Sequence, residues 1–447
     1  MLGTEFIKER VARALQLSKS DETQITFQAH DQALTRFANN IIHQNVSESN
    51  GTLTITAILG RRTGSASTND LSDEGLSKAG ERALNHARNR KEDPQFPGLP
   101  EAQSIQPIQA FDDETANCDP SVRAEAVGLI CNQAMAKNLT AYGAYSTATA
   151  EVAVANSKGV MAYHSGTRAS LQTTIAGDNG SSMAEDSNWR LSQLDPAAIG
   201  QEAVEKAIKA QNPCPIEPGI YEVVLGPYAV MDIVENLSWT GMGARSVQEG
   251  GSWMIGRMGM EVMNPLISIW DDGCDLAGAP LPFDFEGVPR RKVSIVDHGI
   301  VRSPVYDRYT AAKDGVETTG HASPPDMLWM GGPMALHLFM GTGDSSLEEM
   351  IRSTGKGLHI NRFWYTRTVH PRDCVTTGMT RDGVWMIDDG QLAYPVKDLR
   401  FTQSYVDALA NVIAVGGNRR LRISEMGSVV CVPPLKIGIF NFTGVTA

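Results

Sequence analysis

The sequence predicts an α+β protein in which a mixed α+β region precedes a larger β-rich region. Helical spacing and strand-like alternation of apolar residues both occur in the first half. Beyond about residue 265, short strand-like runs follow one another with Gly-rich turns. A proline cluster, Pro213, Pro215 and Pro218, interrupts both patterns. We therefore expect an N-terminal α+β region over residues 1–212 and a β-rich C-terminal domain over residues 213–447.

The N-terminal region contains two groups of predicted helices and strands separated by a Pro-rich stretch. Helical periodicity predicts helices over residues 5–18, 71–89, 120–136 and 195–210. Alternation predicts strands over residues 34–45 and 52–59, and further strands over 139–176 with a turn at 156–159. Prolines 94, 97, 100 and 107 indicate a linker or an extended surface segment. The region can therefore divide into two lobes near residues 92–118, and the two halves are loosely related.

The C-terminal region opens with a short strand and a helix. Residues 220–225 form a continuous apolar run typical of a buried strand. Gly226 and Pro227 then begin a helix, because proline fits the first helical position. The apolar residues of this helix share one face, which predicts that it packs on a core: Val230, Ile233, Val234 and Leu237.

Charge argues against a general nucleic-acid binder. The net charge is −12 and the isoelectric point about 5.3, whereas phosphate contacts need clustered Lys and Arg. Short basic clusters occur at residues 61–62, 290–292 and 419–420. We interpret each of them as a solvated surface turn.

The sequence is typical of a cytoplasmic protein. Its first residues have no basic segment followed by an apolar run, and no stretch approaches the roughly 18–20 apolar residues that span a bilayer. The six cysteines are scattered without a CxxC pair, which favours reduced thiols over a disulfide framework. We therefore expect no membrane association.

Three motifs follow one another in the last third of the chain. They are TTGHA at residues 318–322, DCVTTG at residues 373–378, and GVWMIDDG at residues 383–390 running into Tyr394-Pro395-Val396. In this order they resemble the C-terminal domain of the PmbA/TldD family, also called TldE/TldD and once described as modulators of DNA gyrase. The resemblance extends over the whole chain and is strongest from about residue 218 to 440.

The resemblance implies a zinc motif that this sequence lacks. Metallopeptidase members carry HExxxH on the helix after the Gly-Pro turn, and no histidine here is followed by Glu. In the best register the two histidine positions hold Glu235 and Thr240, and the general-base position holds Asn236. A third ligand in the TldD branch is a cysteine near the C-terminus, and here Cys431 lies in that region. We expect Cys431 to pack as a small apolar residue and this chain to bind no metal.

Two further constellations are candidate sites. The segment HPRDC at residues 370–374 places His370 and Cys374 within five residues. These are the residue types of a cysteine nucleophile that a histidine base activates. Pro371 disfavours a helix there, so a loop or cavity wall is the alternative interpretation. His321 is a candidate substrate contact because Gly320 lets the backbone approach a ligand closely. Its alternative is a structural histidine with satisfied hydrogen bonds.

Other motifs are missing or ambiguous. Acidic residues at 271, 272, 284 and 286 lack the spacing of an EF-hand, so turn chemistry is the favoured interpretation. Residues 350–357 lack the glycine and the Ser or Thr of a Walker A loop. No GxSxG nucleophile elbow occurs.

The leading hypothesis is a metal-free, PmbA/TldE-like subunit that pairs with a zinc-carrying TldD-like subunit and binds unfolded peptides. The resemblance implies a dimer that encloses a cavity, where a peptide pairs with a strand edge. One alternative is a peptidase that uses Cys374, or scattered zinc ligands such as His321 and His370. Another is a homodimeric peptide-binding protein without a peptidase partner.

Overall fold

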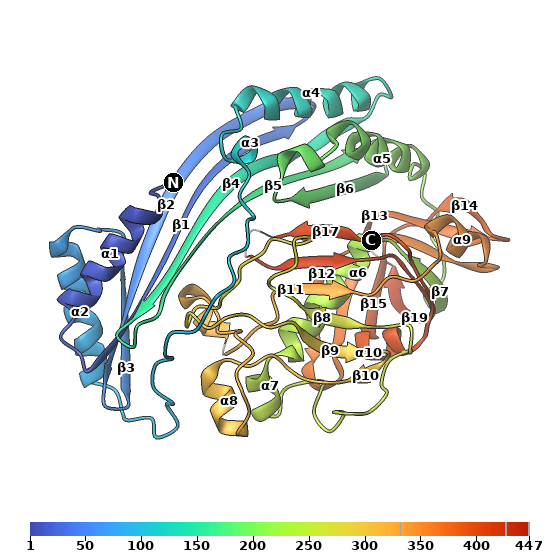
Figure 1. Cartoon of the computed structure of the whole chain (residues 1–447). Helices are drawn as coiled ribbons and strands as arrows, with labels where there is room; N and C mark the ends of the chain where they lie inside the picture. Colours follow the sequence, from blue (N-terminus) through green and yellow to red (C-terminus); the bar gives the residue numbers. More distant parts are fainter. Residues whose placement is uncertain (331, 425–426, 446–447) are drawn as a thin grey trace.

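The structure, a computed structural model, describes residues 1–330, 332–424 and 427–445. It contains three β-sheets (Figure 1). A long, curved N-terminal sheet bends around one side of the C-terminal part of the chain, and the two remaining sheets lie within that part. The α+β class and the β-rich C-terminal region expected from the sequence are confirmed.

The N-terminal sheet consists of six antiparallel strands in the order β3-β2-β1-β4-β5-β6. Long hairpins build it, and β1 pairs with β4 from Gln24 to Phe37, so one sheet joins the two halves of the region. Its strands are β1 (Glu22–Ala38), β2 (Ile41–Leu59), β3 (Arg62–Thr68), β4 (Thr140–Asn156), β5 (Met161–Ala176) and β6 (Ser181–Asn188).

Helices cover the convex face of this sheet (Figure 1). The apolar faces of α1 (Thr4–Leu17) and α2 (Asp73–Arg88) pack on β1 and β2, with Val11, Leu76 and Ile55 fully buried. Helices α4 (Pro120–Met135) and α5 (Pro196–Lys209) pack on the other half. Each half thus has the order helix, three strands, helix, which accounts for the loose relation seen in the sequence.

The segment between α2 and α4 crosses the molecule without a long element. It contains one short helix, α3 (Asp113–Ala116), and a bridge between Ala110 and Gly166 on β5. The carbonyl oxygen of Pro100 accepts a hydrogen bond from Asn156 Nδ2 at 2.8 Å. The predicted linker is therefore an extended segment tied to the sheet. Between β6 and α5 lies a short turn, η1 (Leu191–Gln193).

One strand prediction was wrong in this region, and one strand was missed. The predicted strand over residues 34–45 spans a hairpin turn, where Asn39 and Asn40 adopt φ of 52° and 62°. Two successive left-handed residues are typical of a tight hairpin turn, so the apolar residues on both sides belong to different strands. Strand β6 was not predicted, because its sequence SSMAEDSN lacks the apolar alternation of a strand.

Five strands of the C-terminal part close into a ring. β7 (Ile220–Leu225) pairs with β12 (Lys356–His370) and β19 (Leu435–Val445), and β15 (Leu399–Ser404) pairs with β19 and β13 (Val375–Asp388). Pairing of β12 with β13 closes the ring. Strands β14 (Gln391–Pro395) and β16 (Val412–Val415) extend it. Most strands beyond residue 265 are short, as the sequence predicts, and β12, β13 and β19 are the long exceptions.

A third sheet packs beside the ring in the order β10-β9-β8-β11-β18-β17. Its strands are β8 (Ile269–Asp271), β9 (Val293–Asp297), β10 (Ile300–Val301), β11 (His337–Met340), β17 (Arg420–Ile423) and β18 (Val429–Val432). The remaining helical elements are α6 (Pro227–Leu237), η2 (Ser238–Met242), α7 (Ala244–Gln248), α8 (Arg308–Asp314), η3 (Pro325–Met330), α9 (Leu347–Arg352), η4 (Pro371–Asp373) and α10 (Tyr405–Ala410). Among the described residues, no helix is long and apolar enough to cross a membrane.

Candidate functional site

The segment that the resemblance implies as the zinc-helix position is α6 followed by η2. Gly226 caps α6 and Pro227 occupies its first turn, as the sequence predicts. The helix then continues without a break into η2, which is a π-helix. Because π-turns are rare and concentrate at functional sites, this junction is a candidate site on geometry alone.

Glu235 is held by two residues from the other end of the chain. Its carboxylate forms an ion pair with Arg422 of β17 and accepts a hydrogen bond from the Ser428 hydroxyl at 2.9 Å. Arg422 also lies 3.7 Å from Glu185 of β6. Both carboxylate oxygens of Glu235 are therefore engaged within the protein.

Asp232, one turn earlier on α6, anchors a buried hydrogen-bond network. Its carboxylate accepts bonds from the Thr366 hydroxyl at 2.7 Å and the Tyr405 hydroxyl at 2.8 Å. The Asn236 amide donates to the Asp232 carbonyl at 2.9 Å. Burial raises the pKa of Asp232 to about 6, although these hydroxyl groups stabilise the charged form. Asn236 therefore acts as a structural amide next to the network.

Cys374 lies at the same end of α6. Its sulfur is 3.3 Å from the Thr240 hydroxyl oxygen, and Thr240 donates its proton to the Asn236 carbonyl at 2.7 Å. Cys374 is fully buried, and burial raises the pKa of its thiol to about 11. At neutral pH the residue is a thiol, whereas a cysteine nucleophile must be a thiolate.

His370 is not part of this cluster. It is exposed at the end of β12, where its Nδ1 lies 3.8 Å from Asp373. Residues 371–373 form the short turn η4, so Pro371 begins a helical turn where we expected a loop. The turn directs Cys374 into the core and leaves His370 in solvent. The structure thus separates the two residues that the sequence placed together.

Cys431 faces away from α6. On β18 its neighbours Val430 and Val432 belong to the core that contains α6, whereas Cys431 packs with Phe339, Leu421 and Ile423. This alternation follows from the two-residue period of a strand. Cys431 thus packs as a small apolar residue, and burial raises its thiol pKa to about 11.

The donor set at α6 does not fit zinc. Catalytic zinc sites use three protein ligands, mostly imidazole, thiolate and carboxylate. Glu235 is already paired with Arg422, Thr240 offers a hydroxyl, and Cys431 points elsewhere. Over the described parts of the chain, no three His, Cys, Asp or Glu side chains gather into a group able to hold a metal ion.

His321 lies in a separate, fully buried network. Its Nε2 is 2.9 Å from the Asp271 carboxylate, and its Nδ1 is 2.9 Å from the Thr319 carbonyl oxygen. The other Asp271 oxygen accepts the backbone N–H of His337 at 2.8 Å. Burial opposes ionisation of Asp271, but His321, His337 and Arg290 outweigh it and hold its pKa below the ordinary value. His321 thus has the satisfied contacts of a structural histidine.

The backbone at Gly320 explains why a glycine precedes this histidine. Gly320 has φ of 74°, and a Cβ there would lie 2.3 Å from the Pro289 carbonyl oxygen. The close approach that the sequence suggested is therefore made to the protein's own backbone.

Arg290 and His337 were missed by the sequence interpretation. The Arg290 guanidinium donates to His337 Nδ1 at 2.7 Å, and His337 Nε2 donates to the Ala279 carbonyl at 3.0 Å. Burial, reinforced by Arg290, lowers the pKa of His337 to about 3, so the imidazole is neutral. The interpretation of residues 290–292 as a solvated turn is wrong for Arg290, which is 7% exposed. No sequence signal distinguished it from the exposed Arg291 beside it.

The acidic residues between 271 and 286 have different roles. Asp284 accepts the backbone N–H groups of Glu286 and Val288 at 2.9 Å, which is the predicted turn chemistry. Asp271 differs, because it is the buried partner of His321. Burial and the nearby Asp284 raise the pKa of Glu286 to about 8.

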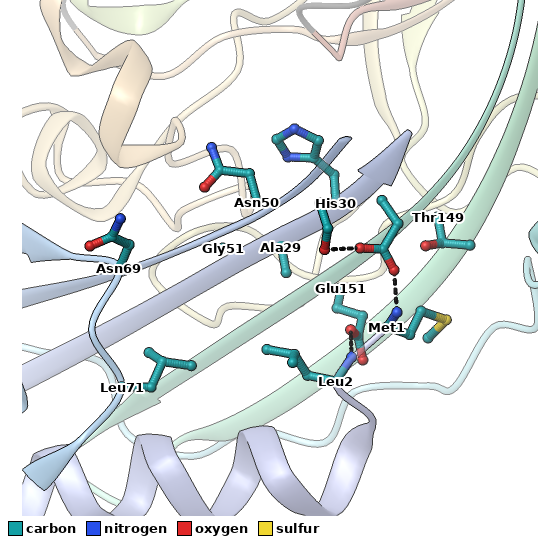
Figure 2. Close-up of a pocket in the computed structure, with 12 residues that line it drawn as sticks. Met1, Leu2, Ala29, His30, Asn50, Gly51, Asn69, Leu71, Thr149 and Glu151 are labelled. Carbon is teal, nitrogen blue, oxygen red and sulfur yellow. Dashed lines mark hydrogen bonds and ion pairs between the residues drawn. The ribbon is translucent and has the colours of Figure 1, made fainter. Parts of the chain in front are cut away.

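The first residues of the chain border a cavity of about 260 Å³ on the convex face of the N-terminal sheet (Figure 2). Glu151 accepts the backbone N–H groups of Leu2 at 2.7 Å and Gly3 at 2.9 Å, and the amino group of Met1 pairs with Asp31. These two acidic side chains therefore hold the first residues of the chain on the sheet.

Comparison with known proteins places this geometry in a family. Three family models match in chain order: PmbA/TldA metallopeptidase domain 1 over residues 25–87, the central domain over residues 97–211, and the C-terminal domain over residues 218–444.

Relatives extend over nearly the whole chain. The "Metalloprotease PmbA" of Escherichia coli O157:H7 is 24% identical over 457 aligned residues, which cover 97% of this chain and 96% of the relative. The crystal structure of TldE from Thermococcus kodakarensis covers 98% of this chain and 100% of its own, with a TM-score of 0.88 and 20% identity. A putative modulator of a DNA gyrase from Thermotoga maritima gives a TM-score of 0.87, 20% identity and the same coverage. From the three matching models, the chain belongs to the PmbA/TldD family of metallopeptidases.

Proposed function

We propose that this chain is the metal-free, TldE-like subunit of a TldD/TldE-type metallopeptidase. In this proposal a TldD-like subunit supplies the zinc, and the present chain helps to bind and position unfolded peptides. The observation that carries the proposal is the cluster at α6 and η2. There Glu235, Asn236 and Thr240 occupy the motif positions, and each is engaged in hydrogen bonds or an ion pair within the protein.

An exposed apolar surface supports docking of a second subunit. Arg257 pairs with Asp373 at 3.0 Å, and Arg372 donates to the Gly250 carbonyl at 2.7 Å, so the loop over residues 250–260 and η4 lie together beside η2. This η2–η4 surface exposes five large apolar residues: Trp239, Ile255, Met258, Met260 and Val369. Contiguous exposed apolar residues mark interaction sites, and methionines adapt to varied partners.

Strand edges support the peptide-binding part of the proposal. In the described sheets, β3 and β6 end the first sheet, and β10 and β17 end the third. Side chains of the protein already bond backbone groups of β3 and β6, and residues 259–260 bond the backbone of β10, so β17 is the remaining candidate edge. An edge strand offers unpaired backbone groups that an extended peptide can bind with little dependence on its sequence.

The decisive experiment measures zinc and peptidase activity with and without a partner. The purified chain should contain far less than one equivalent of zinc by elemental mass spectrometry after dialysis. Together with a TldD-type chain carrying HExxxH, it should form a complex with chelator-sensitive peptidase activity. One equivalent of zinc in this chain, or chelator-resistant activity from it alone, would contradict the proposal.

The docking surface allows a sharper test. Trp239→Asp should weaken capture of the TldD-type chain, because it places a charge on the exposed apolar surface. Leu129→Asp is the matched control, since Leu129 is a large apolar residue on α4 of the N-terminal region and is also exposed, by 51% against 43% for Trp239. Equal capture by both variants would place the interface elsewhere.

A homodimeric peptide-binding protein is the second candidate, because the same surface can receive another copy of this chain. Light scattering of the purified chain distinguishes the two. A monomer that dimerises only with a TldD-type chain favours the subunit role, and a stable dimer alone favours the homodimer. A peptidase based on Cys374 has less support. The Cys374 thiol is buried, whereas His370 is exposed and lies outside the cluster that contains Cys374.

A further inference from the structure

The concave face of the N-terminal sheet faces the C-terminal part of the chain (Figure 1). Residues from both line a second cavity. Its volume is about 560 Å³, within the range of small-molecule sites. One wall is formed by β1, β4 and β5, and the opposite wall by residues 279–290 and the start of β11. This interdomain cavity is separate from the α6–η2 cluster.

His164 of β5 contributes a hydrogen-bond acceptor to the sheet wall. It is 8% exposed and hydrogen-bonded to the backbone of Pro280, whereas its Nε2 has no partner among the described residues. Burial lowers the pKa of His164 to about 4, so the ring is neutral at pH 7. Since the Pro280 carbonyl can only accept, it takes the proton of Nδ1. Nε2 is then unprotonated, and its lone pair is a buried acceptor that can bind an N–H or O–H donor.

Arg290 contributes a positive charge and a donor to the opposite wall. Its Nε also lacks a partner among the described residues, while another nitrogen donates to His337. Packing fixes the side chain, because a Cβ on Gly273 would lie 2.4 Å from Arg290 Cδ. The Asp271–His321 pair behind His337 supports the wall from the core. The guanidinium is thus held in place with a free N–H group, as in a prepared anion site.

Other charged groups surround this wall. The buried carboxylates Asp271 and Asp284 lie near enough to Arg290 for its charge to favour their ionised forms, and they partly offset that charge. Arg168 lines the sheet wall and donates to the Ser424 carbonyl at 2.9 Å. Asp326 lies at the exposed rim, and the Glu151 carboxylate is used by Leu2 and Gly3 on the other face of the sheet. Apolar side chains complete the walls: Val152, Leu281, Phe285, Met327 and Leu336.

We propose that the interdomain cavity binds a ligand with a carboxylate next to an N–H group and an apolar side chain. The carboxylate accepts from Arg290, the N–H group donates to His164 Nε2, and the side chain packs on the apolar wall. A peptide C-terminus and a free amino acid share this chemistry. The inference goes beyond the proposed function, because it requires neither zinc nor a second subunit.

Calorimetric titration of the unmodified chain tests the proposal with three probes: acetyl-leucyl-leucine, its C-terminal amide, and free leucine. The acid should bind at least about tenfold more tightly than the amide, because a charged acceptor roughly doubles the strength of a hydrogen bond. Tighter binding of the dipeptide acid than of leucine identifies a peptide C-terminus as the ligand, and the reverse order identifies an amino acid. Equal binding of acid and amide, or no binding up to about 10 mM, overturns the proposal and leaves a water-filled cavity.

A pair of variants tests the site itself. His164→Leu should weaken binding of the favoured acid about tenfold, because the ligand N–H would enter an apolar wall. His359→Leu is the matched control. His359 is also buried with a pKa lowered to about 4 and bonded to one carbonyl, that of Val224, yet it does not line the cavity. Equal loss in both variants, or no loss in His164→Leu, overturns the assignment.

Discussion

The α6–η2 cluster and the interdomain cavity are two buried polar regions with opposite bonding. In the cluster, Glu235 and Asp232 are bonded by side chains from β17, β12 and α10, so the chain itself occupies the positions around the motif. In the cavity, His164 and Arg290 each keep a polar atom without a partner among the described residues. An unmade buried hydrogen bond costs free energy. The polar groups around the motif positions therefore satisfy one another within the chain, whereas the walls of the cavity keep a buried donor and a buried acceptor without partners among the described residues.

The largest expected effect follows from removing the charge that holds the cluster together. Arg422→Met leaves Glu235 and the buried Glu185 without their cation, and we expect a loss of about 3 kcal/mol in the free energy of unfolding. Scanning calorimetry measures it. Arg367→Met, at an exposed arginine of β12, is the control and should change stability by less than about 0.5 kcal/mol. Equal effects would mean that the cluster is not held by this ion pair.

A pH titration of stability should reveal the neutral histidine of the cavity. The folded-state pKa of His164, about 4, lies below its ordinary value of 6.5. Between these values the unfolded chain binds the additional proton, so His164 lowers the stability as pH falls from about 6.5 to 4. The slope is at most about 1.4 kcal/mol per pH unit. Relative to His164→Leu, the unmodified chain should have constant stability above pH 6.5 and should lose stability below it. A difference independent of pH would contradict the burial of a neutral ring.

Asp232 in the cluster should show the opposite dependence. Its folded-state pKa of about 6 lies above the ordinary 3.8, so the folded state binds the additional proton between these values. The contribution of Asp232 to stability is therefore present at pH 4 and is lost as pH rises to about 6. Relative to Asp232→Asn, the unmodified chain should lose stability over this window. A relative gain with rising pH would indicate that the carboxylate is ionised throughout.

The smallest expected effect on the fold comes from chemical labelling of the cysteines. Cys214 is exposed, whereas Cys374 is fully buried with a thiol pKa of about 11. Iodoacetamide at pH 7.5 should modify Cys214 while Cys374 remains unmodified, as mapped by peptide mass spectrometry. Rapid labelling of Cys374 in the folded chain would instead show that its thiol is accessible and reactive, and would support the cysteine-nucleophile interpretation.

Local patterns predicted most helices and several strands. Helices α2, α4, α5 and α6 and the strand β7 lie within two residues of the predicted ranges, because their apolar periods and proline or polar caps are local properties of the chain. The hairpin between β1 and β2 was missed, since two asparagines in left-handed conformation made the turn without a glycine. Strand β6 is defined by its pairing with β5, which has no local signal.

The sequence by itself determined that HExxxH is absent and that the order of motifs is that of the PmbA/TldD family. Residue identity and short-range spacing suffice for both. Tertiary structure alone decided which side chains meet. Arg422 and Glu235 are 187 residues apart, His321 and Asp271 are 50 apart, and Arg290 and His337 are 47 apart. Whether an arginine is a solvated turn residue or a buried donor depends on such distant partners, because burial and ion pairing are properties of the packed chain rather than of its neighbours in sequence.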